Sequence, residues 1–80
     1  MHTMTHPDQA LPTVYARARE RLAGAGIPTP GVDAELLIGY VLGLSRGGVQ
    51  ARIITEAVLP LEDVLMIAEV VERRAAREPL

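Results

Sequence analysis

The sequence predicts an all-α protein, a small four- to five-helix bundle built around one core. Apolar residues make up 49% of the chain, yet Phe and Trp are absent, so Leu, Ile, Val and Ala have to form the core. Apolar positions recur every three or four residues, and no useful stretch alternates as a strand does. At 80 residues only one modest core is possible, and without cysteine it has to be held by packing alone.

The first helix is expected to start at Leu11 and to stop near Gly24 to Gly26, because the apolar residues from Leu11 to Ala25 form one stripe at the helical period. Gly26 provides a left-handed cap, and Pro28 blocks further helix. Residues 1–10 are expected to be a frayed tail. His2 and His6 within it have the spacing of two metal ligands, but Pro7 follows and no third ligand is near, so no metal site is predicted.

A second helix is expected from Pro30 toward Gly43, with the Thr29 hydroxyl as its N-cap and a proline in its first turn. Its apolar side chains cover most of the helix circumference, which indicates a central helix. Only a strip around Glu35 and Gly39 is left to face solvent.

Ser45 is expected to cap a third helix, in which Gly47 and Gly48 each cost about 1 kcal/mol relative to Ala. This helix is predicted to be the weakest element. The last helix should open at 59–61, with acidic residues in its first turn and arginines in its last, as the helix dipole favours. An extra turn is allowed in the N-terminal segment or near residues 53–58.

Two sides of the last helix carry apolar residues. One side forms the main stripe, and the other is expected to project away from it. The main stripe consists of Leu61, Val64, Leu65, Ala68, Val71 and Ala75, and the second side consists of Met66, Ile67 and Val70. The second side therefore needs its own cover.

No catalytic, cofactor-binding or metal site is predicted in this chain. Asp33 and Glu35 are two residues apart on a helix and so point roughly 200° away from each other, which prevents an acid and base pair. Ser45 has no histidine base nearby, and the glycine pairs follow no strand that could form a phosphate loop. Gly26, Pro30 and Asp33 are given structural roles, Asp33 by balancing its helix dipole or by pairing with an arginine of the last helix.

The candidate partner surface lies on the last helix, where Met66 and Val70 share a face with Arg73 and Arg77. Apolar anchors beside arginines are enriched at protein interfaces. Burial within the bundle is the favoured alternative, and contact with another domain or protein is left open. Arg73, Arg74 and Arg77 are expected to divide between an intradomain partner such as Asp33 and a contact outside this domain.

Charge and hydropathy narrow the remaining classes of partner. The net charge of -2 and pI near 5.6 argue against a general nucleic-acid surface. The longest apolar stretch, 36–44, is about half the roughly 20 residues that a membrane span requires. The N-terminus does not resemble a secretory signal, so a cytoplasmic location is expected by default.

Two other functions stay open on the residues alone. One is a DNA-binding helix-turn-helix, with 43–46 as the turn and 49–54 as the recognition helix, which would offer Arg46, Gln50 and Arg52 to DNA. The other is a dimerisation or adaptor module that buries Met66, Ile67 and Val70 against a second copy.

Several blocks of sequence in a fixed order resemble the N-terminal domain of the PrmC/HemK family of peptide-chain release-factor glutamine methyltransferases. The resemblance covers residues 11–80, although Gly47-Gly48 departs from the family's stronger helix formers. The blocks are Leu22, Gly26-Ile27-Pro28, Pro30, Asp33-Ala34-Glu35-Leu36-Leu37, Val41-Leu42-Gly43-Leu44-Ser45-Arg46 and Arg73-Arg74-Ala75-Ala76-Arg77-Glu78-Pro79-Leu80.

The resemblance implies that residues 11–78 form a helical substrate-recognition domain and that 79–80 begin a linker to a methyltransferase domain. That domain would bind S-adenosylmethionine and methylate the glutamine of a Gly-Gly-Gln loop in a release factor. The family's glycine-rich cofactor loop and its Asn-Pro-Pro-Tyr motif have no counterpart here. We therefore expect no catalysis from this polypeptide alone, and we expect a release factor and the methyltransferase domain as its partners.

Overall fold

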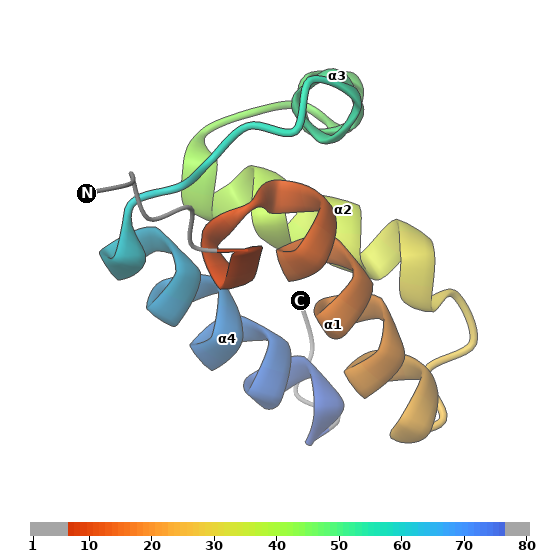
Figure 1. Ribbon diagram of the computed structural model, residues 1–80. Coiled ribbons are helices and arrows are strands. Elements are labelled where there is room, and N and C mark those ends of the chain that lie inside the picture. Colours follow the sequence, from red (N-terminus) through yellow and green to blue (C-terminus); the bar gives the residue numbers. More distant parts are fainter. Residues whose placement is uncertain (1–6, 77–80) are drawn as a thin grey trace.

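The computed structural model describes residues 7–76 as an all-α bundle, which confirms the predicted fold class. Helices α1, α2 and α4 pack against one another, while α3 lies over α2 at the top of the view (Figure 1). The elements in order are η1 (Pro7–Gln9, a 3-10 turn), α1 (Leu11–Gly24), α2 (Pro30–Leu42), α3 (Arg46–Ile54) and α4 (Leu61–Ala75).

The core draws apolar side chains from all four helices and from both longer connections. Its most deeply buried members are Leu11, Leu22, Ile38, Val49 and Ile67. Leucine, isoleucine, valine and alanine make up this core, as the composition predicted. Within residues 7–76, none of the helices has the length and apolarity that crossing a bilayer requires.

The segment before α1 is tied to the connection between α3 and α4. The Leu59 amide donates to the Gln9 carbonyl at 2.8 Å, and the Leu11 amide donates to the Ala57 carbonyl at 2.7 Å. The Gln9 side chain also donates to the Leu59 carbonyl at 2.9 Å. Residues 7–10 thus differ from the frayed tail that we expected for 1–10. Residues 1–6, which include His2 and His6, lie outside the described part of the chain.

The helices begin and end largely at the capping residues and prolines that the sequence indicated. Gly26 takes a φ of 82°, and the Ile27 amide donates back to the Leu22 carbonyl at 3.0 Å, which closes α1. Pro30 is the first residue of α2. Ser45 Oγ accepts from the Gly48 amide at 3.1 Å and caps α3 as predicted. The prediction that the Thr29 hydroxyl caps α2 was wrong, because no side-chain cap bond forms at the start of this helix.

The solvent-facing side of α2 was also predicted wrongly. Glu35 and Gly39 are buried, whereas Leu36 is 45% exposed and Tyr40 is 79% exposed. Helix α3 covers the side that we assigned to solvent. The connection that leads into α3 approaches so closely that a Cβ on Gly39 would overlap the Leu44 carbonyl oxygen.

The rotation of α4 agrees with the prediction only in part. Within the expected main stripe, Val71 and Ala75 are buried, but Leu61 and Leu65 are 58% and 61% exposed. Ile67 of the second side is only 1% exposed. Because apolar residues occur on both sides of α4, the helical period alone cannot choose the buried side. Arg74 lies seven residues after Ile67, hence on the same face, and its contact with α2 fits this rotation.

Candidate functional site

Asp33 forms a buried ionic contact between α2 and α4. It lies in the first turn of α2, is 5% exposed, and accepts from Arg74 Nε at 3.0 Å. The Thr29 hydroxyl donates to its other carboxylate oxygen at 3.0 Å. The sequence suggested an arginine of the last helix as its partner, and the structure places Arg74 there. With its oxygens occupied by these donors, Asp33 has the surroundings of a structural carboxylate rather than of a catalytic base.

A second buried carboxylate, Glu35, holds α3 against α2. Its two oxygens accept from Arg46 Nε at 2.8 Å and from Gln50 Nε2 at 3.0 Å. Sequence reasoning missed this contact, because it placed Glu35 in solvent. The contact also bears on the DNA-binding alternative. Arg46 and Gln50 are two of the three side chains that such a module would offer to DNA, and both are held by α2 instead.

The residues predicted to face a partner are separated by the structure. Met66 is 49% exposed, while Val70 is half-buried against the core. Arg73 is exposed and lies 3.9 Å from Glu69, a loose contact on the same helix. Arg77 lies outside the described residues. Burial within the bundle therefore applies to Val70, whereas Met66 and Arg73 are open to solvent.

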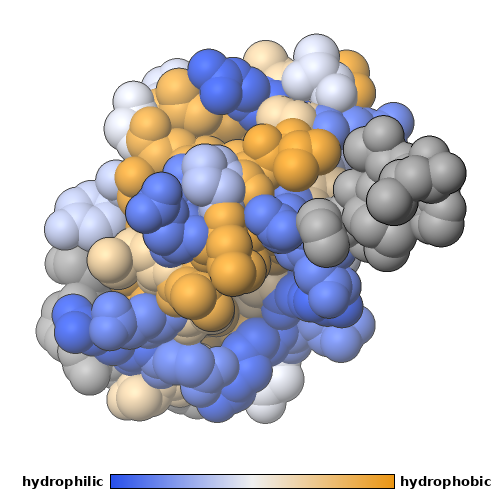
Figure 2. All heavy atoms as spheres, turned by 60° about the vertical axis from the view of Figure 1, so that its left-hand side comes forward, coloured by the Kyte–Doolittle hydropathy of each residue, from blue (hydrophilic) through white to orange (hydrophobic). Residues whose placement is uncertain are grey.

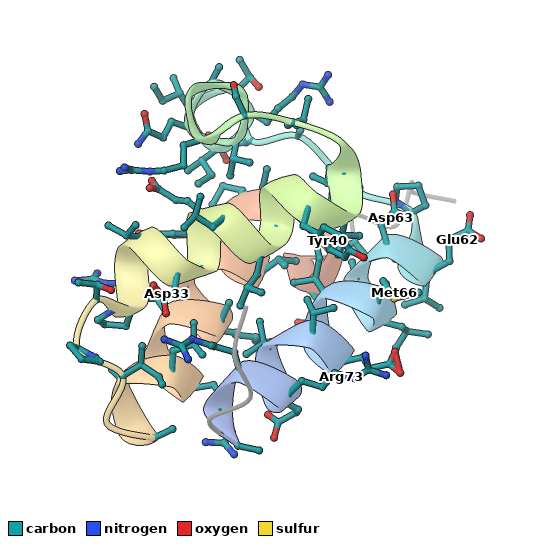
Figure 3. The ribbon with its side chains drawn as sticks, turned by 180° about the vertical axis from the view of Figure 1, so that it is seen from behind. Asp33, Tyr40, Glu62, Asp63, Met66 and Arg73 are labelled. Atoms are coloured by element: carbon teal, nitrogen blue, oxygen red, sulfur yellow. The ribbon has the colours of Figure 1, made fainter. Side chains whose placement is uncertain are left out.

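Met66 lines a shallow groove between the end of α2 and the start of α4. Its other lining residues are Tyr40 and Val41 of α2 and Glu62 and Asp63 of α4. Figure 3 shows Tyr40, Asp63 and Met66 gathered at this junction, with Arg73 further along α4. We call this site the Tyr40–Met66 groove.

Further residues lie at helical spacing from the groove along the two helices. Leu36 precedes Tyr40 by one helical turn on the exposed side of α2, and Val70 and Arg73 follow Met66 at helical spacing on α4. We call Leu36, Tyr40, Met66, Val70 and Arg73 together the α2–α4 face. Its α2 half was missed, although the spacing of four between Leu36 and Tyr40 was visible in the sequence.

Another apolar area covers the start of α4 on the opposite flank. Val58, Leu61 and Leu65 are 61%, 58% and 61% exposed. Figure 2, which brings this side of the molecule forward, shows apolar side chains gathered in its middle with hydrophilic residues around them. These residues lie at the end of the α3–α4 connection and on the first turns of α4.

A hollow of about 260 Å³ lies between α1 and α4. Its walls are mainly apolar, and two ion pairs stand among its lining residues: Arg17 with Asp8 at 2.9 Å, and Arg21 with Glu72 at 2.8 Å. Among the described residues that line it there is no histidine, serine, threonine or tyrosine, and its two carboxylates, Asp8 and Glu72, are the ones paired with arginines. Among residues 7–76, no three His, Cys, Asp or Glu side chains lie together as metal ligands would.

The comparisons with known proteins agree on one family. A model of the PrmC N-terminal domain family matches residues 13–80. The chain is similar to three curated proteins named release factor glutamine methyltransferase. The one from Streptomyces coelicolor is 44% identical over 66 residues, which cover 81% of this chain and 21% of the relative. The one from Deinococcus radiodurans is 41% identical over 75 residues, covering 88% and 24%.

The third relative, from Caulobacter vibrioides, is 33% identical over 72 residues, which cover 88% of this chain and 24% of the relative. This chain therefore spans between a fifth and a quarter of the length of these relatives. No solved structure matches it.

Proposed function

Because the chain belongs to the PrmC N-terminal domain family, we propose that it is the substrate-docking domain of a release factor glutamine methyltransferase. In this proposal the α2–α4 face contacts a peptide-chain release factor. A separate methyltransferase domain of the full-length protein then modifies the glutamine of the Gly-Gly-Gln loop. When bound in that domain, S-adenosylmethionine supplies the methyl group.

The observation that carries this proposal is the exposure of large apolar side chains that the core does not use. Tyr40 is 79% exposed and Met66 is 49% exposed, and neither belongs to the core cluster or to the side chains packed against it. Exposed apolar groups that cluster beside an arginine are typical of surfaces that bind other proteins. Tyr40 is the strongest candidate anchor, because tyrosine offers a large rigid contact area with few rotatable bonds.

Docking would contribute to the reaction by holding the substrate near the catalytic domain. A second binding site on the same polypeptide raises the effective concentration of the reactive glutamine there. A rigid helical bundle suits this task, because the buried contacts at Asp33 and Glu35 fix its helices relative to one another. The same role needs no nucleophile or metal within the domain itself.

The three C-terminal arginines have separate places in the proposal. Arg74 is engaged with Asp33 inside the domain. Arg73 is exposed and loosely held by Glu69, so it is assigned to the release-factor contact. A contact of Arg77 with the methyltransferase domain or the release factor stays a proposal that rests on the family resemblance.

Part of the surface that the self-association alternative requires is buried within the bundle. It required Met66, Ile67 and Val70 to meet a second copy, but Ile67 is 1% exposed within the bundle. Sedimentation analysis over a wide concentration range distinguishes the two functions. A mass that stays at one chain agrees with a docking domain, and a reversible dimer that protects Met66 would favour the alternative.

A direct test is an NMR titration of the isotope-labelled chain with a bacterial peptide-chain release factor. We expect shifts confined to the α2–α4 face. The variant Tyr40→Ser should weaken binding about tenfold, in the range of an interface anchor. Ile54→Ser is the matched control, because Ile54 is also 79% exposed but lies on α3. No shifts in an intact domain, or a larger effect of the control variant, would contradict the proposal.

A further inference from the structure

The Tyr40–Met66 groove has a composition that suits one kind of occupant. Val41 and the Met66 side chain provide apolar walls, and the exposed Tyr40 ring stands beside them. Glu62 and Asp63, consecutive residues in the first turn of α4, both line the groove. Asp63 lies on the side of Tyr40 and Met66, whereas the Glu62 side chain extends outward at the edge (Figure 3). A surface that combines an aromatic ring, an aliphatic wall and negative charge favours a cationic side chain.

The two carboxylates carry no partner within residues 7–76. Neither Glu62 nor Asp63 takes part in a side-chain hydrogen bond or an ion pair there, whereas Asp33, Glu35 and Glu72 are all paired with arginines. The nearest arginine that follows on α4 is Arg73, ten residues after Asp63 and hence about 15 Å away along the helix axis. Negative charge in the groove is therefore not neutralised by the helix that carries it.

The position of Glu62 and Asp63 in the first turn of α4 explains part of this arrangement of charges. Acidic residues in a first turn stabilise a helix through its dipole, wherever the helix lies. That effect does not require an exposed tyrosine and a methionine to flank the carboxylates. The apolar groove and the two carboxylates that are unpaired within residues 7–76 therefore both restrict which kind of side chain can bind there.

We propose that the Tyr40–Met66 groove binds an arginine side chain presented by the protein partner. The guanidinium would pair with the Asp63 carboxylate and lie over the ring of Tyr40, while its aliphatic stem would contact Met66. Glu62 would add negative charge at the edge of the groove. The partner is the release factor in so far as the proposed function holds. The inference adds the chemistry of recognition, which neither the family match nor the names of the relatives give.

Arginine fits the groove better than other side chains. Its planar guanidinium stacks on an aromatic ring and pairs with carboxylates in a fork, whereas the lysine ammonium is a more strongly hydrated point charge. A purely apolar side chain would displace water from two carboxylates without replacing the lost hydrogen bonds. An acidic side chain would be repelled.

The first experiment tests the groove without the release factor. The labelled chain is titrated with a short peptide that carries one arginine, and separately with the same peptide that carries citrulline, which has the same shape without the charge. We expect concentration-dependent shifts of the Tyr40 ring and the Met66 methyl group with arginine only. The double variant Glu62→Gln, Asp63→Asn should lose them, and the control Glu20→Gln, an exposed acid on α1, should keep them.

The second experiment measures release-factor affinity at low and moderate salt. We expect the double variant to bind about tenfold more weakly at low salt, with a smaller difference at higher salt because exposed charges are screened. Unchanged spectra of buried residues such as Val49 verify that the variant is folded. Tyr40→Leu, which keeps apolar area but removes the ring, should reduce the preference for arginine over lysine.

The outcomes separate the inference from the proposed function. Equal responses to arginine and citrulline, or unchanged release-factor affinity in the double variant, would overturn the arginine site. Docking itself would still stand if Tyr40→Ser weakened binding. Failure of the unmodified chain to bind any release factor would overturn the proposed function, and the peptide comparison would still decide the chemistry of the groove.

Discussion

Arg74 Nε lies 3.0 Å from Asp33 Oδ2 and thereby joins the last turn of α4 to the first turn of α2. The side chains are 24% and 7% exposed. Since Tyr40 follows Asp33 along α2 while Met66 precedes Arg74 along α4, the two helices run in opposite directions. The ion pair at one end thus fixes the register that brings Tyr40 and Met66 together at the other.

The Asp33–Arg74 pair is expected to stabilise the domain measurably. Asp33→Ala should lower the free energy of unfolding by about 3 kcal/mol, because it leaves a partly buried guanidinium without its carboxylate. A double-mutant cycle with Arg74→Ala should give a coupling energy of about 1–3 kcal/mol. Urea denaturation followed by circular dichroism measures both.

The control for that cycle is the exposed pair of Asp8 and Arg17, whose side chains are 72% and 65% exposed. Its coupling should stay at about 0.5 kcal/mol or less, since solvent screens the charges. Equal coupling energies in the two cycles would show that burial of the Asp33–Arg74 pair contributes nothing.

Loss of the Glu35 carboxylate should loosen α3 before the rest of the bundle. Glu35→Ala removes the acceptors of Arg46 and Gln50 and should cost about 2 kcal/mol, as for hydrogen bonds to a charged group. Amide hydrogen exchange should accelerate more at Val49 than at Leu22 of α1. Uniform acceleration over all four helices would refute a local role for this contact.

A methyl group at position 39 should be far more harmful than one at position 24. In Gly39→Ala the new Cβ would overlap the Leu44 carbonyl oxygen, so we expect a loss of about 3 kcal/mol. Gly24 ends α1 with nothing within 4 Å of the added Cβ, and Gly24→Ala should be neutral or slightly stabilising. Thermal unfolding of both variants checks the difference, and similar melting temperatures would contradict the close approach.

Substitution of Gly47 should strengthen the shortest of the four helices. The added Cβ of Gly47→Ala would meet nothing nearer than Ser45 Oγ at 3.9 Å, so the helical preference of alanine should appear as a gain of about 0.5–1 kcal/mol. Gly48→Ala should gain less, because its Cβ would lie 3.3 Å from Leu44 Cβ. Chemical denaturation of the two variants side by side tests this, and a greater gain from Gly48→Ala would reverse the expectation.

Helix boundaries were predictable because the residues that set them act over a few positions. Gly26 with Pro28 ends α1, Pro30 starts α2, and the Ser45 hydroxyl caps α3. Thr29 shows where this reasoning fails. Its hydroxyl was expected to cap the helix, but it donates a hydrogen bond to the Asp33 side chain four residues later instead.

The orientation of the helices about their axes was much less predictable, and this affected the prediction of the candidate site most. Both α2 and α4 carry apolar residues on several sides, so periodicity predicted neither the exposure of Tyr40 nor the burial of Ile67. Glu35 was misplaced for a related reason. A carboxylate is expected in solvent unless a partner covers it, and its partners Arg46 and Gln50 are on another helix.

By itself, the sequence determined the all-α class, the approximate ends of the helices and the family, because these depend on composition, on caps and on the order of short motifs. Only the tertiary structure decided which sides of α2 and α4 stay exposed and therefore which residues form the Tyr40–Met66 groove. The physical reason is that several apolar faces of similar strength compete for one small core. The choice among them follows from contacts between distant residues, above all Asp33 with Arg74 and Glu35 with Arg46.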